Sequence, residues 1–365
     1  TVSQLYASNT FGAVLGVVGT GYFLLPYLGI NATTAIAVTT NMLVAAGFWV
    51  GTRFSFDDLI SVARPAQQAE TVERPAITPI QGAVIVGFGL SGAAAMFYEV
   101  AWTRTLSMIL GTTTYAFTTM LAVILLGIAV GSWTYRLLPR SLSRSHAFIF
   151  LQLFIGASVL LTIPAFEKLP FVYLSLHSWL VESWGDMQLI RFLLAALIML
   201  PPTLAMGALF PVVTAVFVET RDHAGTRLGT AYALNTFGAM IGACFAGLVL
   251  IPTLGMQKTI LCGAVLNGLA ALGAVLYLST SFLHRFAFSA VVIIALLITS
   301  VSVSPWSPRI ISSGVYVYAS KYDKMQHEYS EAADSSQKIP ELSPWNIWEL
   351  SMKQYDLLYY NTGIA

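Results

Sequence analysis

One carboxylate lies well inside an apolar stretch, Glu99 in the run Met96-Phe-Tyr-Glu-Val-Ala-Trp-Thr-Arg104. A charged group in a membrane helix is costly and usually faces a cavity or a partner, so Glu99 and Arg104 are candidates for a polar pathway. They are five residues apart, which is about 140° around a helix and makes a poor intrahelical pair. The structural alternative is an interfacial carboxylate flanked by the aromatic anchors Tyr98 and Trp102.

Three uncharged polar residues are further pathway candidates: Tyr115, Asn9 and Asn235. Tyr115 follows the threonines at 112–114, which can line a polar vestibule or simply cap the start of a helix. Asn9 and Asn235 each precede Thr-Phe-Gly, and their amides can bond across a helix interface. Packing and capping therefore explain these residues without a transport role.

A proline-rich segment, Pro201-Pro202-Thr-Leu-Ala-Met-Gly207-Ala-Leu-Phe-Pro211, removes several backbone donors within about three helical turns. We therefore predict that the helix breaks or kinks here. Broken membrane helices often mark transport sites, although a break can also serve only to shape a bundle.

No arrangement typical of catalysis or of cofactor binding is found. The sequence contains no Ser/His/Asp set, Walker sequence, HExxH, CxxC pair or glycine fingerprint after a strand, so we predict no catalytic residue, metal site or cofactor. Cys244 and Cys262 lie in apolar runs and His177 is isolated, which suits packing and surface roles. Whether the protein is an enzyme stays open.

The amino-acid composition indicates the environment of these residues. The 365 residues are 56% hydrophobic and 10% charged, whereas soluble domains carry about 25% charged residues. We predict an all-α polytopic membrane protein whose first partner is the lipid bilayer. A net charge of +1 gives no reason to expect nucleic acid as a partner. Apolar runs long enough to cross a ~30 Å hydrocarbon core number nine, at 5–25, 32–51, 80–109, 114–136, 147–165, 187–218, 227–251, 258–279 and 286–303.

The segment from Tyr232 to Gly255 repeats the segment from Tyr6 to Gly29, 226 residues earlier, without a gap. The register extends to Asn41 and Asn267. So long a period is typical of a duplicated half-protein, as in membrane transporters, and not of a solenoid. Residues 80–280 then form a six-helix half, residues 1–51 supply the last two helices of a first half, and four more helices are expected before residue 1. The spacings Gly12/Gly16, Gly238/Gly242 and Gly127/Gly131 predict close helix packing.

Two six-helix halves joined by a polar loop are typical of the major facilitator superfamily, whose halves are parallel repeats. The polar segment 52–79 is the expected linker, and it is placed in the cytoplasm because arginines gather on that side of the predicted topology. Residues 281–303 are an extra span, which puts residues 304–365 outside the cytoplasm. Alternation at Val315–Tyr318 and near Tyr355–Tyr360 predicts strands at the start of a truncated soluble α/β domain.

These motifs also resemble a known family. The runs Gly92–Gly111, Thr114–Phe117, Leu125–Ser132 and Pro202–Gly207, together with the repeated Tyr-Ala-x-Asn-Thr-Phe-Gly-Ala, resemble bacterial fused membrane proteins of the spermidine-synthase-like kind. In those proteins a facilitator-like helical region precedes an aminopropyltransferase fold, and Trp306–Tyr316 and Leu358–Gly363 resemble the start of that fold. The resemblance implies the bacterial inner membrane. It assigns no catalytic residue here, because the family's glycine loop and acidic residues would lie after residue 365.

Three functions fit these features. The bundle handles a small molecule, for which a cationic, polyamine-like compound is one candidate; or it anchors an aminopropyl- or methyltransferase-like domain; or it is a structural subunit whose partners are other membrane or extracytoplasmic subunits. A polar cavity reached by Tyr115, Asn235 or the proline segment would favour the first function. A bundle packed solid by apolar side chains would oppose it.

Overall fold

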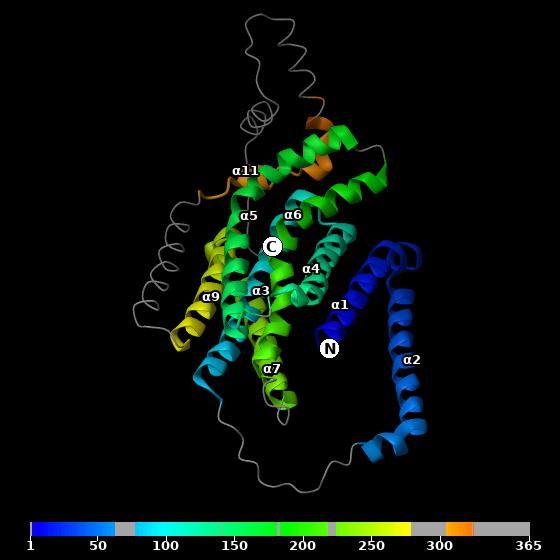
Figure 1. Cartoon of the computed structure of the whole chain (residues 1–365). Helices are drawn as coiled ribbons and strands as arrows, with labels where there is room; N and C mark the ends of the chain where they lie inside the picture. The colour runs from blue at the N-terminus through cyan, green and yellow to red at the C-terminus, as the bar shows by residue number, and fades with distance from the viewer. Residues whose placement is uncertain are drawn as a thin grey trace, which may run out of the picture. The chain divides into compact units, whose positions relative to one another are not determined.

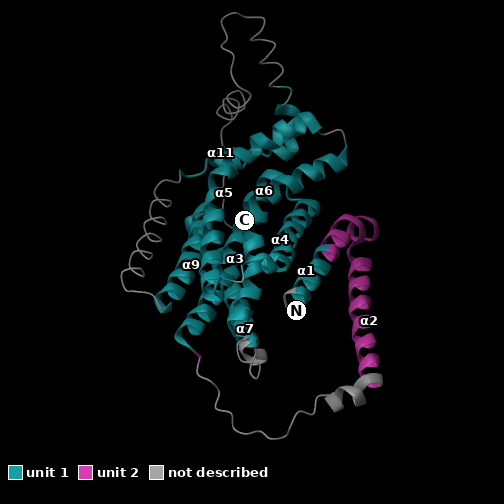
Figure 2. Ribbon diagram, viewed as in Figure 1, with its two compact units in different colours: residues 1–14, 78–365 teal, residues 15–77 magenta. Residues whose placement is uncertain are grey.

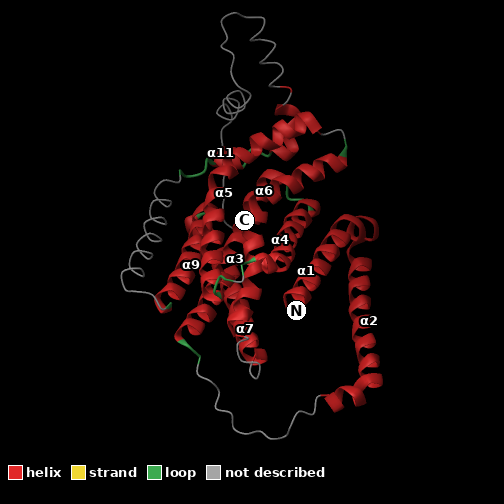
Figure 3. Ribbon diagram, viewed as in Figure 1, coloured by secondary structure: helices red, strands yellow, loops and turns green. Residues whose placement is uncertain are grey.

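A computed structural model describes residues 2–62, 77–139, 141–180, 183–217, 224–278, 304–322 and 324. Across these ranges the regular structure is helical and contains no strand (Figure 3). The prediction of an all-α fold is confirmed. Seven of the described helical stretches are long and apolar enough to span a membrane: Gln4–Arg53, Pro79–Leu110, Thr114–Leu137, Arg144–Leu180, Trp184–Phe217, Leu228–Leu254 and Met256–Tyr277.

The first stretch contains two of the predicted spans. It covers most of α1 (Val2–Gly19), a π-helical turn (Thr20–Leu24) and most of α2 (Leu25–Val62). The backbone leaves the helical conformation at Gly29, with φ 71° and ψ 178°. This interruption separates the runs predicted at 5–25 and 32–51. The run predicted at 286–303 lies outside the described residues.

The remaining helices are placed along the chain as follows (Figure 1). They are α3 (Pro79–Leu110), α4 (Thr114–Thr134) with a short 3₁₀ turn (Tyr135–Leu137), α5 (Arg144–Leu180), α6 (Trp184–Phe217), α7 (Ala224–Phe245), a π-helical turn (Ala246–Leu250), α8 (Ile251–Leu254), α9 (Met256–Tyr277) and α11 (Pro308–Ile311). The start of α3 carries a capping box, in which Thr78 and Gln81 bond each other's backbone N–H, followed by a proline at the first helical position. The residues at the start of α3 therefore determine where this helix begins.

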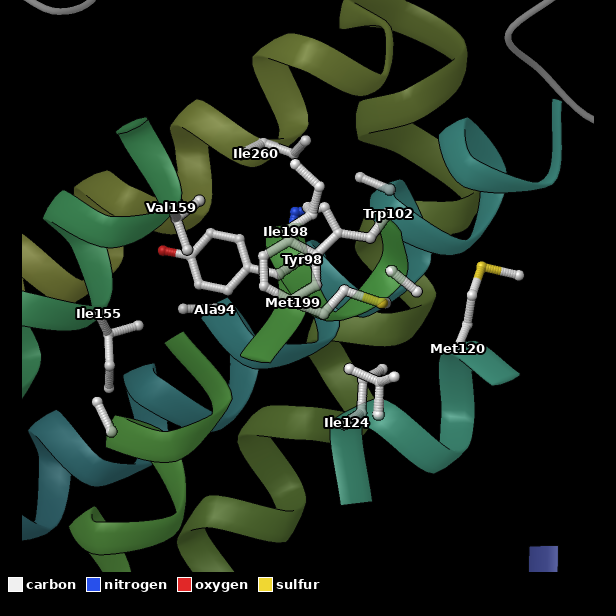
Figure 4. Close-up of a cluster of buried hydrophobic side chains, with 14 of the residues drawn as sticks. Ala94, Tyr98, Trp102, Met120, Ile124, Ile155, Val159, Ile198, Met199 and Ile260 are labelled. Carbon is white, nitrogen blue, oxygen red and sulfur yellow. The ribbon is translucent and has the colours of Figure 1, made fainter. Parts of the chain in front are cut away.

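The chain divides into two compact units, residues 15–77 and the rest (Figure 2). In the larger unit α3 packs against α7 and α9, α4 against α6, and α5 against α6 and α9. Its core is apolar, with Tyr98 and Trp102 fully buried among aliphatic side chains such as Ile155, Ile198 and Ile260 (Figure 4). The buried core of this unit is therefore formed mainly by apolar side chains.

Glycines set the closest helix contacts. A Cβ at Gly238 of α7 would clash with the carbonyl oxygen of Gly89 on α3, and one at Gly242 would lie 2.6 Å from the Cα of Ala93. Between α4 and α6 the backbone positions that leave no room for a Cβ are Gly127, Gly131 and Gly207. The close packing predicted from the spacings Gly238/Gly242 and Gly127/Gly131 is confirmed.

The sequence repeat has a counterpart in the backbone. The π-helical turns Thr20–Leu24 and Ala246–Leu250 occupy equivalent positions. In each copy a glycine with positive φ follows five residues later, Gly29 at 71° and Gly255 at 83°. With ψ near 180°, this conformation is essentially restricted to glycine.

Helix α2 continues to Val62, past the predicted start of the linker at residue 52, and residues 63–76 of the linker lie outside the described residues. The linker stays a prediction. The prediction of strands at the start of the tail is wrong. The segment predicted to begin with strands is helical, in α11 and at 315–322. Ile311 at the end of α11, and Val315 and Ala319 in the helical segment that follows, are all at most 3% exposed. Val315 and Ala319 are four residues apart, which places them on one face of that segment. The region of Tyr355–Tyr360 lies outside the described residues.

Candidate functional site

Three buried polar side chains form a chain across three helices. The Tyr98 hydroxyl of α3 donates to Oδ1 of Asn267 on α9 at 2.6 Å. Asn267 Nδ2 in turn donates to Oε1 of Gln152 on α5 at 2.5 Å. All three residues are at most 1% exposed. Because polar groups in an apolar interior bond strongly and are costly when unpaired, this chain ties α3, α9 and α5 together.

The direction of these hydrogen bonds limits their chemistry. Tyrosine donates, asparagine accepts and then donates, and glutamine accepts, while Gln152 Nε2 has no hydrogen-bond partner. No carboxylate or imidazole belongs to the chain, so it lacks the groups that ordinarily exchange protons near neutral pH. The arrangement is suited to fixing helix positions.

Apolar and aromatic groups surround the three hydrogen-bonded side chains. The Trp102 ring stacks on Tyr98 with centroids 5.4 Å apart and planes at 19°. Gly263 of α9 lies under the Tyr98 ring, where a Cβ would be 2.8 Å from Cζ. Figure 4 shows the two rings among Ala94, Ile198 and Met199. The Trp102 indole nitrogen is also buried and has no hydrogen-bond partner.

Glu99 follows Tyr98 in the sequence and is half-buried. Its backbone carbonyl accepts from the Thr103 hydroxyl at 2.7 Å. A pathway role for Glu99 and Arg104 stays a prediction.

Tyr115 and Asn235 are found in packing and capping environments. The Tyr115 ring meets Trp184 edge-on with centroids 5.1 Å apart, and the neighbouring Thr113 caps α4 by accepting from the Ala116 N–H at 3.2 Å. Asn235 Nδ2 donates to the Phe88 carbonyl at 2.8 Å. Asn9, its equivalent in α1, is exposed. Asn235 thus makes an interhelical bond and Thr113 a helix cap, while a pathway role for Tyr115, Asn9 and Asn235 stays a prediction.

The proline segment does not interrupt its helix. Pro201, Pro202 and Pro211 lie inside the continuous helix α6. Thr203 follows the proline pair and its hydroxyl donates to the carbonyls of Met199 and Leu200, at 2.7 and 3.1 Å. The prolines therefore do not break the helix, a kink stays a prediction, and Gly207 allows the backbone of Ile128 to approach.

A second buried polar cluster lies between α5 and α6. Arg191 Nη1 donates to Gln188 Oε1 at 3.3 Å, and both residues are at most 8% exposed. Arg191 Nε, Gln188 Nε2 and the hydroxyl of Tyr173 are buried without a hydrogen-bond partner. No sequence motif joins the members of this cluster, because they come from two helices.

The chain Tyr98–Asn267–Gln152 was missed for a similar reason. Each of its residues is a lone polar group in an apolar run, and only Asn267 carried a signal, its match to Asn41 in the repeat. A search for amides inside predicted spans would have selected Asn267 and Gln152. It could not have paired them.

Two grooves lie on the larger unit, and both are mostly apolar. One of about 380 Å³ runs between α3 and α9, from Pro79 to Tyr277. The other, of about 330 Å³, lies between α1 and α4 and includes Phe11 and Trp133. Neither is lined by Tyr115, Asn235 or the proline segment, so these grooves do not bring the predicted pathway residues together.

Among the described residues no group of three or more His, Cys, Asp or Glu side chains could hold a metal ion. No protein-family model matches the sequence, and searches of curated proteins and of solved structures find no match. The interpretation of the site therefore rests on the geometry described above.

Proposed function

We propose that the chain is the facilitator-like membrane region of a spermidine-synthase-like fused protein and that it acts as a scaffold, located in the bacterial inner membrane. Its task is to hold the segment that begins at Ser304, outside the cytoplasm, on the end of the bundle. The proposal that the bundle also carries an aminopropyl- or methyltransferase-like domain beyond this segment rests only on the sequence resemblance.

The observation that carries this proposal is the set of hydrogen bonds around Trp306. Its indole Nε1 donates to the Ile163 carbonyl at 2.9 Å, and its backbone N–H donates to Gln257 Oε1 at 3.0 Å. Gln257 Nε2 returns a bond to the Ser304 carbonyl at 2.8 Å. The next N–H, of Ser307, donates to Glu167 Oε1 at 2.5 Å.

Apolar packing completes this attachment. The Trp306 ring lies 4.9 Å from the ring of Phe166, and Ile311 and Val315 are fully buried in the bundle core. Tyr316 covers Gly111, where a Cβ would lie 2.8 Å from its ring. Specific polar and apolar contacts of this kind support a scaffold role.

Weakening this attachment tests the scaffold proposal. The double substitution Glu167→Ala/Gln257→Ala removes two side-chain acceptors and should speed hydrogen–deuterium exchange of residues 308–322, while α3–α9 stay protected. Lys258→Ala is the matched control, since Lys258 is exposed beside Gln257. Unchanged exchange in the double variant would contradict the proposal.

The side of the membrane is a separate test. With Cys244 and Cys262 replaced by alanine, a cysteine at the exposed position Ser320 should react with an impermeant maleimide added outside intact cells. Ser143→Cys, exposed between α4 and α5, should react only after the membrane is opened. The reverse pattern would overturn the proposed orientation.

A transport role is the second candidate, favoured by one observation. The π-helical turn and the positive-φ glycine recur in the same order in α1–α2 and in α7–α9, and such duplication of helices is typical of transporter halves. Substitution of Glu99 by Gln separates the two roles. It should reduce uptake of a polyamine by whole cells if the bundle transports one, and leave the exchange of residues 308–322 unchanged.

A further inference from the structure

The buried cluster of Tyr173, Gln188 and Arg191 presents unpaired hydrogen-bond donors. Arg191 can only donate, so the Gln188 atom that faces its Nη1 at 3.3 Å is the oxygen Oε1, and the amide Nε2 is left as a donor. Gln188 Nε2, Arg191 Nε and the Tyr173 hydroxyl are all buried without a hydrogen-bond partner. These three groups therefore suit a ligand that is rich in acceptor oxygens.

The three side chains lie at one place between α5 and α6. Gln188 and Arg191 are three residues apart on α6, which places them on the same side of that helix. Tyr173 comes from α5, which packs against α6. Its hydroxyl lies within electrostatic reach of the Arg191 guanidinium without forming a hydrogen bond to it. The Tyr173 ring stacks on His177 with centroids 6.2 Å apart, which limits the positions that the hydroxyl can take.

Arg191 carries a positive charge that its neutral amide partner does not balance. A guanidinium stays protonated in proteins, and the exposed fraction of Arg191 is 5%, with Leu194 beside it at 2%. A buried charge is costly unless it is paired and hydrogen-bonded. Asp186 lies five residues earlier, about 140° around α6, and its carboxylate accepts from the N–H and the hydroxyl of Ser183, both at 2.8 Å. The surroundings of Arg191 therefore favour a bound anion.

The cluster lies near the joined ends of α5 and α6. These helices contain 37 and 34 residues, which is about 50–55 Å of helix, whereas the hydrocarbon core is ~30 Å thick, so about 10 Å extends beyond it at each end. Tyr173 lies seven residues before the end of α5 and Arg191 seven residues after the start of α6, or about 10 Å from these ends. Trp179 and Trp184 are 89% and 55% exposed there, as is typical of interface anchors. The cluster is therefore at the level where lipid headgroups meet the hydrocarbon core.

We propose that Tyr173, Gln188 and Arg191 bind a phosphate group at the membrane interface. The planar guanidinium matches the oxygens of phosphate, and the amide and the hydroxyl supply further donors to the same group. The phosphate of an anionic lipid headgroup lies at this level, and free phosphate reaches it from water, so both sources offer the same chemistry. This site does not depend on the scaffold role or on what the scaffold carries.

Native mass spectrometry of the full chain in a maltoside detergent tests this site. Phosphatidylglycerol and inorganic phosphate are added in separate titrations, and the mass of a one-to-one adduct tells which source the site accepts. Arg191→Gln should weaken this binding about tenfold or more, because hydrogen bonds to charged groups are the strong ones. Tyr173→Phe should weaken it by a smaller factor. It keeps the buried ring, so it tests the site even where Arg191→Gln impairs folding.

Lys168→Gln is the matched control. It removes one positive charge from an exposed position of α5 and should leave the binding unchanged. Neutral diacylglycerol is the matched lipid and should bind more weakly than phosphatidylglycerol. Absence of an adduct in both titrations, equal binding of the two lipids without an adduct of inorganic phosphate, or an unchanged affinity in either Arg191→Gln or Tyr173→Phe would overturn the proposal.

Discussion

The two copies of the repeat share local structure but not surroundings. Both contain a π-helical turn and a glycine with positive φ at equivalent positions. Yet Asn267 is 1% exposed at the centre of a hydrogen-bonded chain, whereas its equivalent Asn41 is exposed. The backbone conformation of the repeat is therefore determined by its own sequence. The contribution of each residue to stability depends instead on the helix that packs beside it.

The largest effect should separate these two asparagines. Asn267→Ala leaves the Tyr98 hydroxyl and the Gln152 carbonyl oxygen unpaired, at about 1–3 kcal/mol for each buried group. Asn41→Ala, at an exposed position, should change the free energy of unfolding by no more than about 0.5 kcal/mol. Unfolding by SDS in mixed micelles measures both values. Equal losses would show that the copies have equivalent surroundings.

A multiple variant sharpens this test. Replacing Tyr98 by Phe, and Gln152 and Asn267 by Leu, removes every polar partner at once. Because an apolar replacement of both members of a hydrogen bond is close to neutral, this variant should recover most of the stability lost in Asn267→Ala. No recovery would mean that packing of Asn267, and not its hydrogen bonds, stabilises the bundle.

A smaller effect should be the same in both copies. Gly29→Ala and Gly255→Ala each force an L-residue into a backbone region that costs about 1–3 kcal/mol. Since this strain is local, the two losses of unfolding free energy should agree, unlike those of Asn41 and Asn267. The control is Gly273→Ala, inside α9 with open space around it, which should stabilise the helix by up to about 1 kcal/mol. A loss at only one of the two glycines would break the local equivalence.

Hydrophobic length and the repeat were enough to predict the helical membrane fold, because both depend on local composition. The strand predicted at Val315–Tyr318 failed because Val315 and Ala319 pack on the bundle as one helical face, a tertiary contact that alternation cannot reveal. Pro201 and Pro202 do not break α6, because a packed bundle tolerates prolines inside a membrane helix. The chain Tyr98–Asn267–Gln152 depends on residues from three helices, and no sequence spacing joins them.

The smallest predicted effect concerns Asn235 and Asn9. Asn235→Ala removes one interhelical hydrogen bond to Phe88, which is worth about 0.6 kcal/mol on average in membrane bundles. Asn9→Ala should have no measurable effect on the purified chain, where Asn9 is exposed. SDS titration of the purified chain measures both losses, and equal losses would show that the hydrogen bond of Asn235 does not distinguish the two copies.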